Sequence, residues 1–167
     1  VFKEMNMADD RLEAQVGALL LAKGLTLCAA ESCTGGLVMH RLTDIPGSSA
    51  YVLGGVVAYA NEAKESLLGV RRATLIAHGA VSDETAEEMA RGALDAFNAD
   101  LAISITGIAG PGGGSALKPV GLTYIGVAAR AGICAVQRCL FSGDRAAIKQ
   151  AAADEAFRMV IDIAGKQ

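Results

Sequence analysis

Tryptophan is missing from the 167-residue chain, and aromatic residues as a whole make up only 4% of it. Proteins that stack nucleic-acid bases need aromatic faces, so stacking surfaces of that kind are scarce here. Lysine and arginine number 15 against 18 acidic residues, which gives a formal net charge of -3, and no basic run stands out. A basic patch is the usual electrostatic footprint of nucleic-acid binding. We therefore expect no nucleic-acid partner.

Cysteine and histidine are too few and too scattered to form a metal-binding motif. No C-x-x-C pair occurs, and neither His40 nor His78 lies at zinc-finger spacing from a cysteine. We expect both histidines to be structural, without a carboxylate partner. The four cysteines are Cys28, Cys33, Cys134 and Cys139. Three of them lie in apolar stretches typical of reduced core residues. The sequence predicts no metal and no cofactor and, since no signal peptide opens it, a cytoplasmic location.

Long uninterrupted hydrophobic runs are also absent. The charge-free stretches 45–61 and 101–117 contain proline or several glycines, so we expect no membrane span. Hydrophobic residues still make up 52% of the chain, enough for a substantial core, and the length suits one domain. We expect that domain to cover residues 8–165. Residues 1–7 are expected to be a disordered or cloning-derived N-terminus, with Met7 as a suitable native start.

Apolar runs predict five strands. Three of them read as buried strands, at 25–30, 51–60 and 101–106. Gly54 and Gly55 indicate a bulge in the second of these. The other two runs, 120–129 and 133–140, flank a short turn and predict an antiparallel hairpin.

Helical periodicity alternates with these strands. The expected helices run from a cap at Asp9 or Asp10 to Gly24, over 36–43, over 62–68 after a cap at Asn61, from Ser82 to Phe97, and onward from Asp144. Strands that alternate with helices, together with one hairpin, predict an α/β fold. We expect a three-layer α/β/α domain around one mixed β-sheet.

The first polar loop, Ala30 to Gly36 (AESCTGG), follows a predicted buried strand and precedes a helix. Ligands in open α/β sheets usually bind at the carboxyl ends of strands. Ser32, Thr34, Gly35 and Gly36 could therefore hold an anion or an oxyanion, and either hydroxyl could be a nucleophile. The same residues suit an ordinary helix cap. Cys33 is a rival nucleophile, since thiolate is favoured at a helix N-terminus.

The second polar loop runs from Tyr59 to Lys64 (YANEAK). It places the Lys64 amine in the first turn of a helix, near the sheet edge where Ser32 should emerge. A desolvated lysine can lose its proton and serve as a base. The alternative is a solvated surface lysine.

The third polar loop is rich in glycine and matches neither a Walker A motif nor G-x-G-x-x-G in context. Its candidate substrate-binding residues are Thr106, Gly107, Gly110 and Gly112. Lys118 at its end, and Arg145 at the start of the last helix, could each pair with a phosphate. The alternative is a mobile surface loop with two solvated cations.

Several ordered segments of the chain together resemble the CinA C-terminal domain family. They are AESCTGG at 30–36, TDIPGSSAY at 43–51, YANEAKESLLGV at 59–70, HGAVS at 78–82, ITGIAGPGGG at 105–114, KPVG at 118–121 and FSGDR at 141–145. The similarity covers nearly the whole chain after Met7.

The resemblance implies an amidase that hydrolyses nicotinamide mononucleotide to nicotinate mononucleotide and ammonia without a metal. It implies Ser32 as the nucleophile, Lys64 and Tyr59 as assisting residues, and the glycine-rich loop as a wall of the nucleotide site. The chain resembles the stand-alone form of the family, without its amino-terminal molybdopterin-type domain, and we expect a homodimer. A non-catalytic nucleotide-binding module and a cysteine hydrolase using Cys33 remain the alternatives at this point.

Overall fold

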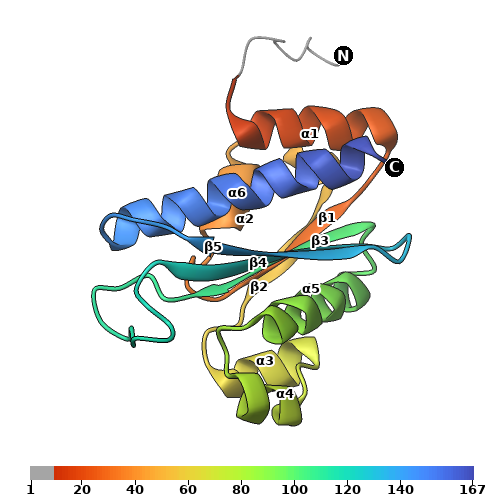
Figure 1. Ribbon diagram of the computed structural model, residues 1–167. Helices are drawn as coiled ribbons and strands as arrows, with labels where there is room; N and C mark the ends of the chain where they lie inside the picture. Colours follow the sequence, from red (N-terminus) through yellow and green to blue (C-terminus); the bar gives the residue numbers. More distant parts are fainter. Residues whose placement is uncertain (1–9) are drawn as a thin grey trace.

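The computed structural model describes residues 10–167 and contains one five-stranded sheet in the order β2-β1-β3-β4-β5 (Figure 1). The strands are β1 (Leu27–Glu31), β2 (Val52–Val57), β3 (Leu101–Gly107), β4 (Leu122–Ala129) and β5 (Cys134–Leu140). The predicted N-terminal extension, and Asp9 as a candidate cap, lie outside the described residues.

The sheet is mixed, as the sequence predicts. Strand β1 lies next to the edge strand β2 and pairs in parallel with both β2 and β3. Strands β3, β4 and β5 pair antiparallel, which confirms the predicted hairpin. The expected bulge is confirmed too, because Leu27 pairs with Val52 whereas Cys28 pairs with Gly54, leaving Leu53 as an extra residue.

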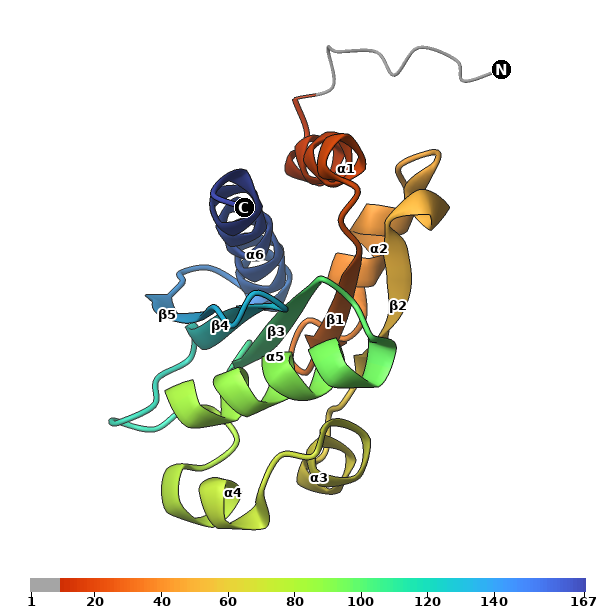
Figure 2. The same ribbon diagram turned by 90° about the vertical axis from the view of Figure 1, so that its right-hand side faces the viewer.

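Helices cover both faces of the sheet, which confirms the three-layer α/β/α fold (Figure 2). One face carries α1 (Leu12–Lys23), α2 (Leu37–Thr43) and α6 (Arg145–Gly165). The other carries α5 (Asp83–Phe97), with α3 (Asn61–Leu68) and α4 (Arg72–His78) beyond it, and a short 3-10 turn (Ser48–Ala50) precedes β2. No helix among residues 10–167 has the length and apolar character to cross a membrane.

Alternation along β3 divides the core into two parts. Leu101, Ile103 and Ile105 belong to the large cluster that includes α1, α2 and α6. Ala102 belongs to the cluster on the α5 face, where small residues prevail. Close packing on that face needs Gly126, because a Cβ there would lie 2.5 Å from the Ser104 hydroxyl.

The predicted ends of several helices are confirmed. Helix α1 ends at Gly24, which adopts a left-handed conformation with φ +65°. Ser82 Oγ accepts the backbone N–H of Thr85 and caps α5, and Asp144 accepts the N–H of Ala147 and caps α6.

Two predicted caps are wrong. Arg11, rather than Asp10, occupies the N-cap position of α1, and Asp10 contributes its backbone carbonyl, which accepts a hydrogen bond from the Gln15 side chain. Asn61 is the first helical residue of α3, so Ala60 takes the N-cap position and no side chain caps the helix. Both errors are a shift of one residue: Asp10 lies before the N-cap position of α1 and Asn61 lies inside α3, so neither occupies the position from which a side chain caps a helix.

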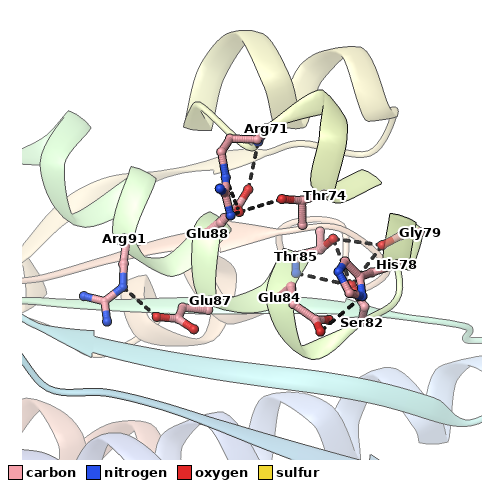
Figure 3. A network of polar contacts seen from close by, with 10 residues as sticks. All are labelled: Arg71, Thr74, His78, Gly79, Ser82, Glu84, Thr85, Glu87, Glu88 and Arg91. Carbon is pink, nitrogen blue, oxygen red and sulfur yellow. Dashed lines mark hydrogen bonds and ion pairs between the residues drawn. The ribbon is translucent and has the colours of Figure 1, made fainter. Parts of the chain in front are cut away.

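Helix α4 was not predicted, and tertiary contacts hold it. The Glu88 carboxylate on α5 accepts hydrogen bonds from the backbone and guanidinium of Arg71 and from the Thr74 hydroxyl (Figure 3). Thr74 and Leu75 are the buried residues of α4. Helix α4 has seven residues, which span too few turns to show helical periodicity in the sequence. Packing rather than intrinsic propensity therefore determines this helix.

The expectation that both histidines lack a carboxylate partner is wrong. His40 lies 3.6 Å from Asp44, one turn along, at the end of α2. His78 Nδ1 lies 3.2 Å from Glu84 Oε1, because the turn after α4 brings the start of α5 alongside it (Figure 3). Both pairs are largely exposed, which suits a structural role.

Candidate active site

Ser32 lies in a tight turn that links β1 to α2. Its backbone N–H donates to the carbonyl of Ile105 at 2.9 Å, which extends the β1–β3 pairing by one residue. Its own carbonyl accepts the N–H of Gly35 at 3.1 Å. Gly35 and Gly36 have φ values of +62° and +98°, conformations that glycine adopts without strain. The side chain of Ser32 thus emerges at the carboxyl end of β1.

The Glu31 carboxylate, which the sequence analysis missed, occupies the start of α2. It is fully buried and accepts the backbone N–H groups of Gly36, Val38 and Met39 at 3.0 to 3.1 Å. These are the donors that an incoming anion would use. The expected anion site at the start of α2, including the Gly36 N–H, is therefore corrected: the protein's own carboxylate fills it.

Lys64 is buried against Ser32, so the alternative of a solvated lysine is wrong. Its side chain is 1% exposed and its Nζ lies 3.0 Å from Ser32 Oγ. The amine also contacts the carbonyl oxygens of Ala58 at 2.9 Å and Tyr59 at 3.0 Å. Burial lowers the pKa of Lys64 from its ordinary range, because the charged form loses its hydration.

These three contacts set the direction of proton transfer. Carbonyl oxygens can only accept, so Ala58 and Tyr59 take two N–H bonds of the amine. In a neutral amine, these are all the hydrogens there are, and the lone pair is left for the Ser32 hydroxyl. The arrangement therefore suits a base that removes the proton of Ser32.

Cys33 lacks the features of an activated thiol. Burial raises the pKa of its thiol to about 11, and the nearby cations Arg145, Lys149 and Lys64 lower it by less. Among the residues that the structure describes, no side chain accepts a hydrogen bond from its sulfur. The thiol thus stays protonated near neutral pH.

Tyr59 contacts the site through its backbone, and its phenol lies elsewhere. The Tyr59 carbonyl accepts from Lys64, whereas its hydroxyl accepts from the Arg145 guanidinium at 3.1 Å. The same guanidinium donates to the carbonyl of Gly110 at 2.7 Å. Arg145 therefore joins the β2–α3 connection to the glycine-rich loop, and Tyr59 is 60% exposed beside them.

The glycine-rich loop is tied to the rest of the molecule at several points. Thr106 Oγ donates to the carbonyl of Ala80, and Gly107 pairs with Thr123 at the end of β3. Lys118 Nζ donates to the carbonyl of His78 at 2.6 Å, so this amine tethers the loop to the end of α4. Gly112 lies in the exposed part of the loop.

Two further groups lie beside Ser32: the hydroxyl of Thr34, which the sequence predicted as a site residue, and the amine of Lys149, which it did not. The Thr34 hydroxyl is fully buried and has no hydrogen-bond partner within residues 10–167. The amine of Lys149, on α6, lies above the turn: a Cβ placed on Gly35 would be 3.8 Å from it. Its spacing of one helical turn from Arg145 was the available signal. Over the same described range, no three His, Cys, Asp or Glu side chains are grouped to hold a metal ion.

Comparisons with known proteins agree on one family. A model of the CinA C-terminal domain matches residues 9–164. A putative competence-damage inducible protein of Moorella thermoacetica is 59% identical over 141 residues, which are 84% of this chain and 34% of the relative. A protein of Enterobacter agglomerans named nicotinamide-nucleotide amidohydrolase PncC is 51% identical over 85% of this chain and 87% of its own length.

Solved structures show the same relationship. The crystal structure of the competence/damage inducible protein CihA from Agrobacterium tumefaciens has a TM-score of 0.90 and 44% identity, covering 91% of this chain and 93% of that one. A CinA superfamily protein from Klebsiella pneumoniae also has a TM-score of 0.90, at 36% identity. The chain spans only about a third of the length of the first curated relatives: 34% of the protein of Moorella thermoacetica and 38% of a CinA-like protein of Chloroherpeton thalassium.

Proposed function

The chain belongs to the CinA C-terminal domain family, and we propose that it is an amidase that hydrolyses nicotinamide mononucleotide to nicotinate mononucleotide and ammonia. The name of the Enterobacter agglomerans relative supports this substrate and reaction. The single observation that carries a catalytic role is the buried contact of 3.0 Å between Lys64 Nζ and Ser32 Oγ. Burying a lysine costs free energy. If Ser32 were only a helix cap, it would not need a buried lysine beside it.

In the proposed mechanism, Ser32 Oγ attacks the carboxamide carbon while neutral Lys64 takes the hydroxyl proton. The resulting ammonium group of Lys64 returns that proton to the leaving nitrogen as the C–N bond breaks, and ammonia departs. An ester of the nicotinoyl group with Ser32 remains. Lys64 then takes a proton from water as the water oxygen attacks the ester carbonyl, and it returns that proton to Ser32 Oγ as the ester bond breaks, which releases the nicotinate product and restores the Ser32 hydroxyl.

The oxyanion formed in these steps needs hydrogen-bond donors close to Ser32. The N–H groups of Gly35 and Gly36 are engaged by Ser32 and Glu31. The N–H of Thr34 makes no hydrogen bond within residues 10–167, and over the same range that of Cys33 contacts only its own thiol, so neither is taken by a backbone carbonyl or a carboxylate. We assign the oxyanion to these two donors, which directly follow the nucleophile along the chain.

Arg145 is the proposed contact for the nucleotide phosphate, with Tyr59 as its support. The phenol and the Gly110 carbonyl hold two of its nitrogens and so fix the direction of the guanidinium. Its remaining N–H groups can bind phosphate oxygens. Tyr59 thus assists through Arg145 and through its carbonyl on Lys64, and a proton relay through its phenol is not required.

Other parts of the proposal concern the whole protein. We propose one domain over residues 8–165, a homodimer in the cytoplasm, and neither nucleic acid nor membrane as a partner. The acidic net charge of -3 and the scarcity of aromatic residues support the exclusion of nucleic acid.

Ammonia release from purified protein tests the proposed reaction. Nicotinamide mononucleotide should yield ammonia and nicotinate mononucleotide in equal amounts, and nicotinamide riboside should be a much poorer substrate because it lacks the phosphate. Tight binding of the mononucleotide without turnover would instead favour the non-catalytic binding module. Equal kcat/KM for the two compounds would refute a phosphate subsite.

A further inference from the structure

Lys149 and Arg145 lie one turn apart on α6, on the side of the helix that covers the Ser32 turn. Residues four apart on a helix share a face, with roughly 6 Å between their Cβ atoms. Arg145 reaches Tyr59 and Gly110 on one side of the turn. Lys149 Nζ lies above Gly35, 3.8 Å from where a Cβ would be. The two side chains thus flank one end of the turn that carries the nucleophile.

Among the residues that the structure describes, no acidic group pairs with Lys149. Its amine makes no hydrogen bond or ion pair within residues 10–167, although its side chain is half-buried. The positions three and four residues away on α6 hold alanine or Arg145. Asp154, the next acidic residue on the helix, pairs with Arg41 at 2.7 Å.

The carboxylates nearest the turn are engaged elsewhere. Glu31 accepts three backbone N–H groups of α2, and Asp144 caps α6 through the N–H of Ala147. The positive field of the cations reaches into the turn, where Arg145, Lys149 and Lys64 each lower the pKa of Cys33 against the larger effect of burial. Three basic groups therefore surround one turn in a chain with a net charge of -3.

We propose that Lys149 and Arg145 together form a subsite for a phosphate monoester, with Lys149 as the cation that no sequence motif identified. Two basic groups one helical turn apart can each donate a charge-assisted hydrogen bond to a phosphate that lies between them. The subsite rests on the proposed function, because it would hold the 5′-phosphate of the nucleotide while the carboxamide meets Ser32. It determines specificity for nucleotide over nucleoside.

Ribose 5-phosphate is a probe that tests this subsite without catalysis. Isothermal titration calorimetry of the full chain should detect its binding, and Lys149→Gln, which keeps most of the aliphatic stem, should weaken it by roughly tenfold or more. Lys149→Arg should restore most of the affinity. Lys166→Gln is the matched control, since it removes the same charge from the far end of α6, and it should leave binding unchanged.

Two results would overturn the subsite: no detectable binding of ribose 5-phosphate to the unaltered protein, or equal affinity in the Lys149→Gln variant and its control. A thermal melt shows whether each variant is folded. If Lys149→Gln is unfolded, its loss of binding is not counted, and Lys149→Arg is tested in its place. The subsite then requires that Lys149→Arg keep most of the affinity of the unaltered protein. Ammonia release tests the reaction separately. Binding that depends on Lys149 in a protein that releases no ammonia would sink the amidase and keep the subsite.

Discussion

Lys64 holds its amine against two backbone carbonyls and the Ser32 hydroxyl, so its protonation state controls whether Ser32 can lose a proton. Only the neutral amine has a lone pair free for this purpose. Burial lowers its pKa below the ordinary value of about 10.4, which raises the neutral fraction at a given pH.

The rate should consequently depend on pH with a definite sign. Log kcat/KM should rise with pH up to the pKa of Lys64 and level off above it, because the free enzyme must hold the amine neutral. The plateau should be reached below about pH 10.4, the ordinary lysine value. A pH–rate profile for ammonia release checks this, and a rate that falls as the pH rises through this range would contradict a lysine base.

Replacing Lys64 should nearly abolish turnover. Lys64→Met keeps an apolar chain in the buried space and removes the nitrogen, so we expect a loss of at least about 10²-fold. Members of one catalytic unit are strongly non-additive, so the double variant with Ser32→Ala should be hardly worse than Ser32→Ala alone. Lys23→Met, at an exposed position in the last turn of α1, is the control and should keep full activity. Multiplicative losses in the double variant would mean that the two residues act independently.

At the residue level, the sequence predicted the reactive side chains of the site but missed the hydrogen-bond partners that hold them in place. Ser32 and Lys64 were predicted as a pair, and the structure brings them within 3.0 Å. The backbone carbonyls that orient the amine leave no mark in a sequence. Glu31 was passed over because it ends an apolar run, and its partners are backbone N–H groups of α2.

Among the elements, hydrophobic periodicity predicted the strands and the longer helices, but it predicted their ends less accurately. Strand β2 ends at Val57 rather than at Ala60, because the chain leaves the sheet to begin α3. Helix α4 depends on Glu88 and on burial against α5, contacts that a seven-residue period cannot reveal.

The corrected cap positions predict a contrast in stability. Ser82→Ala removes the oxygen that accepts the Thr85 N–H and should lower the free energy of unfolding by about 1–2 kcal/mol. Asn61→Ala removes no cap, since Asn61 lies inside α3, and should change it by less than about 0.5 kcal/mol. Urea denaturation measures both. Equal destabilisation by the two substitutions would mean that Asn61 caps α3 after all.

For the whole molecule, alternation of strands and helices predicted three layers and a mixed sheet, and both are confirmed. Such a pattern defines layers because each amphipathic helix must cover a face of the sheet. It contains no information on how copies of the chain associate, so the homodimer stays a prediction that sedimentation can test.

No step of the proposed reaction needs a metal ion. Within residues 10–167 no group of three potential metal-binding side chains exists, and Ser32 is activated by an amine. Ammonia release should therefore be unchanged after EDTA treatment and dialysis, and added Mg²⁺ or Zn²⁺ should not increase it. Loss of turnover on chelation, restored by a divalent ion, would contradict the mechanism.

The identity of the nucleophile is tested by comparing Ser32→Ala and Cys33→Ala in the same ammonia-release assay with nicotinamide mononucleotide. Circular dichroism and a thermal melt establish that both variants are folded. Ser32→Ala should lose at least about 10⁴-fold in kcat, because within residues 10–167 the Ser32 hydroxyl is the only one hydrogen-bonded to the Lys64 amine. Cys33→Ala should keep most of its activity, because burial raises the pKa of that thiol to about 11 and no basic side chain within residues 10–167 accepts a hydrogen bond from it. An active Ser32→Ala together with a dead Cys33→Ala would contradict the account and assign the attack to the thiol.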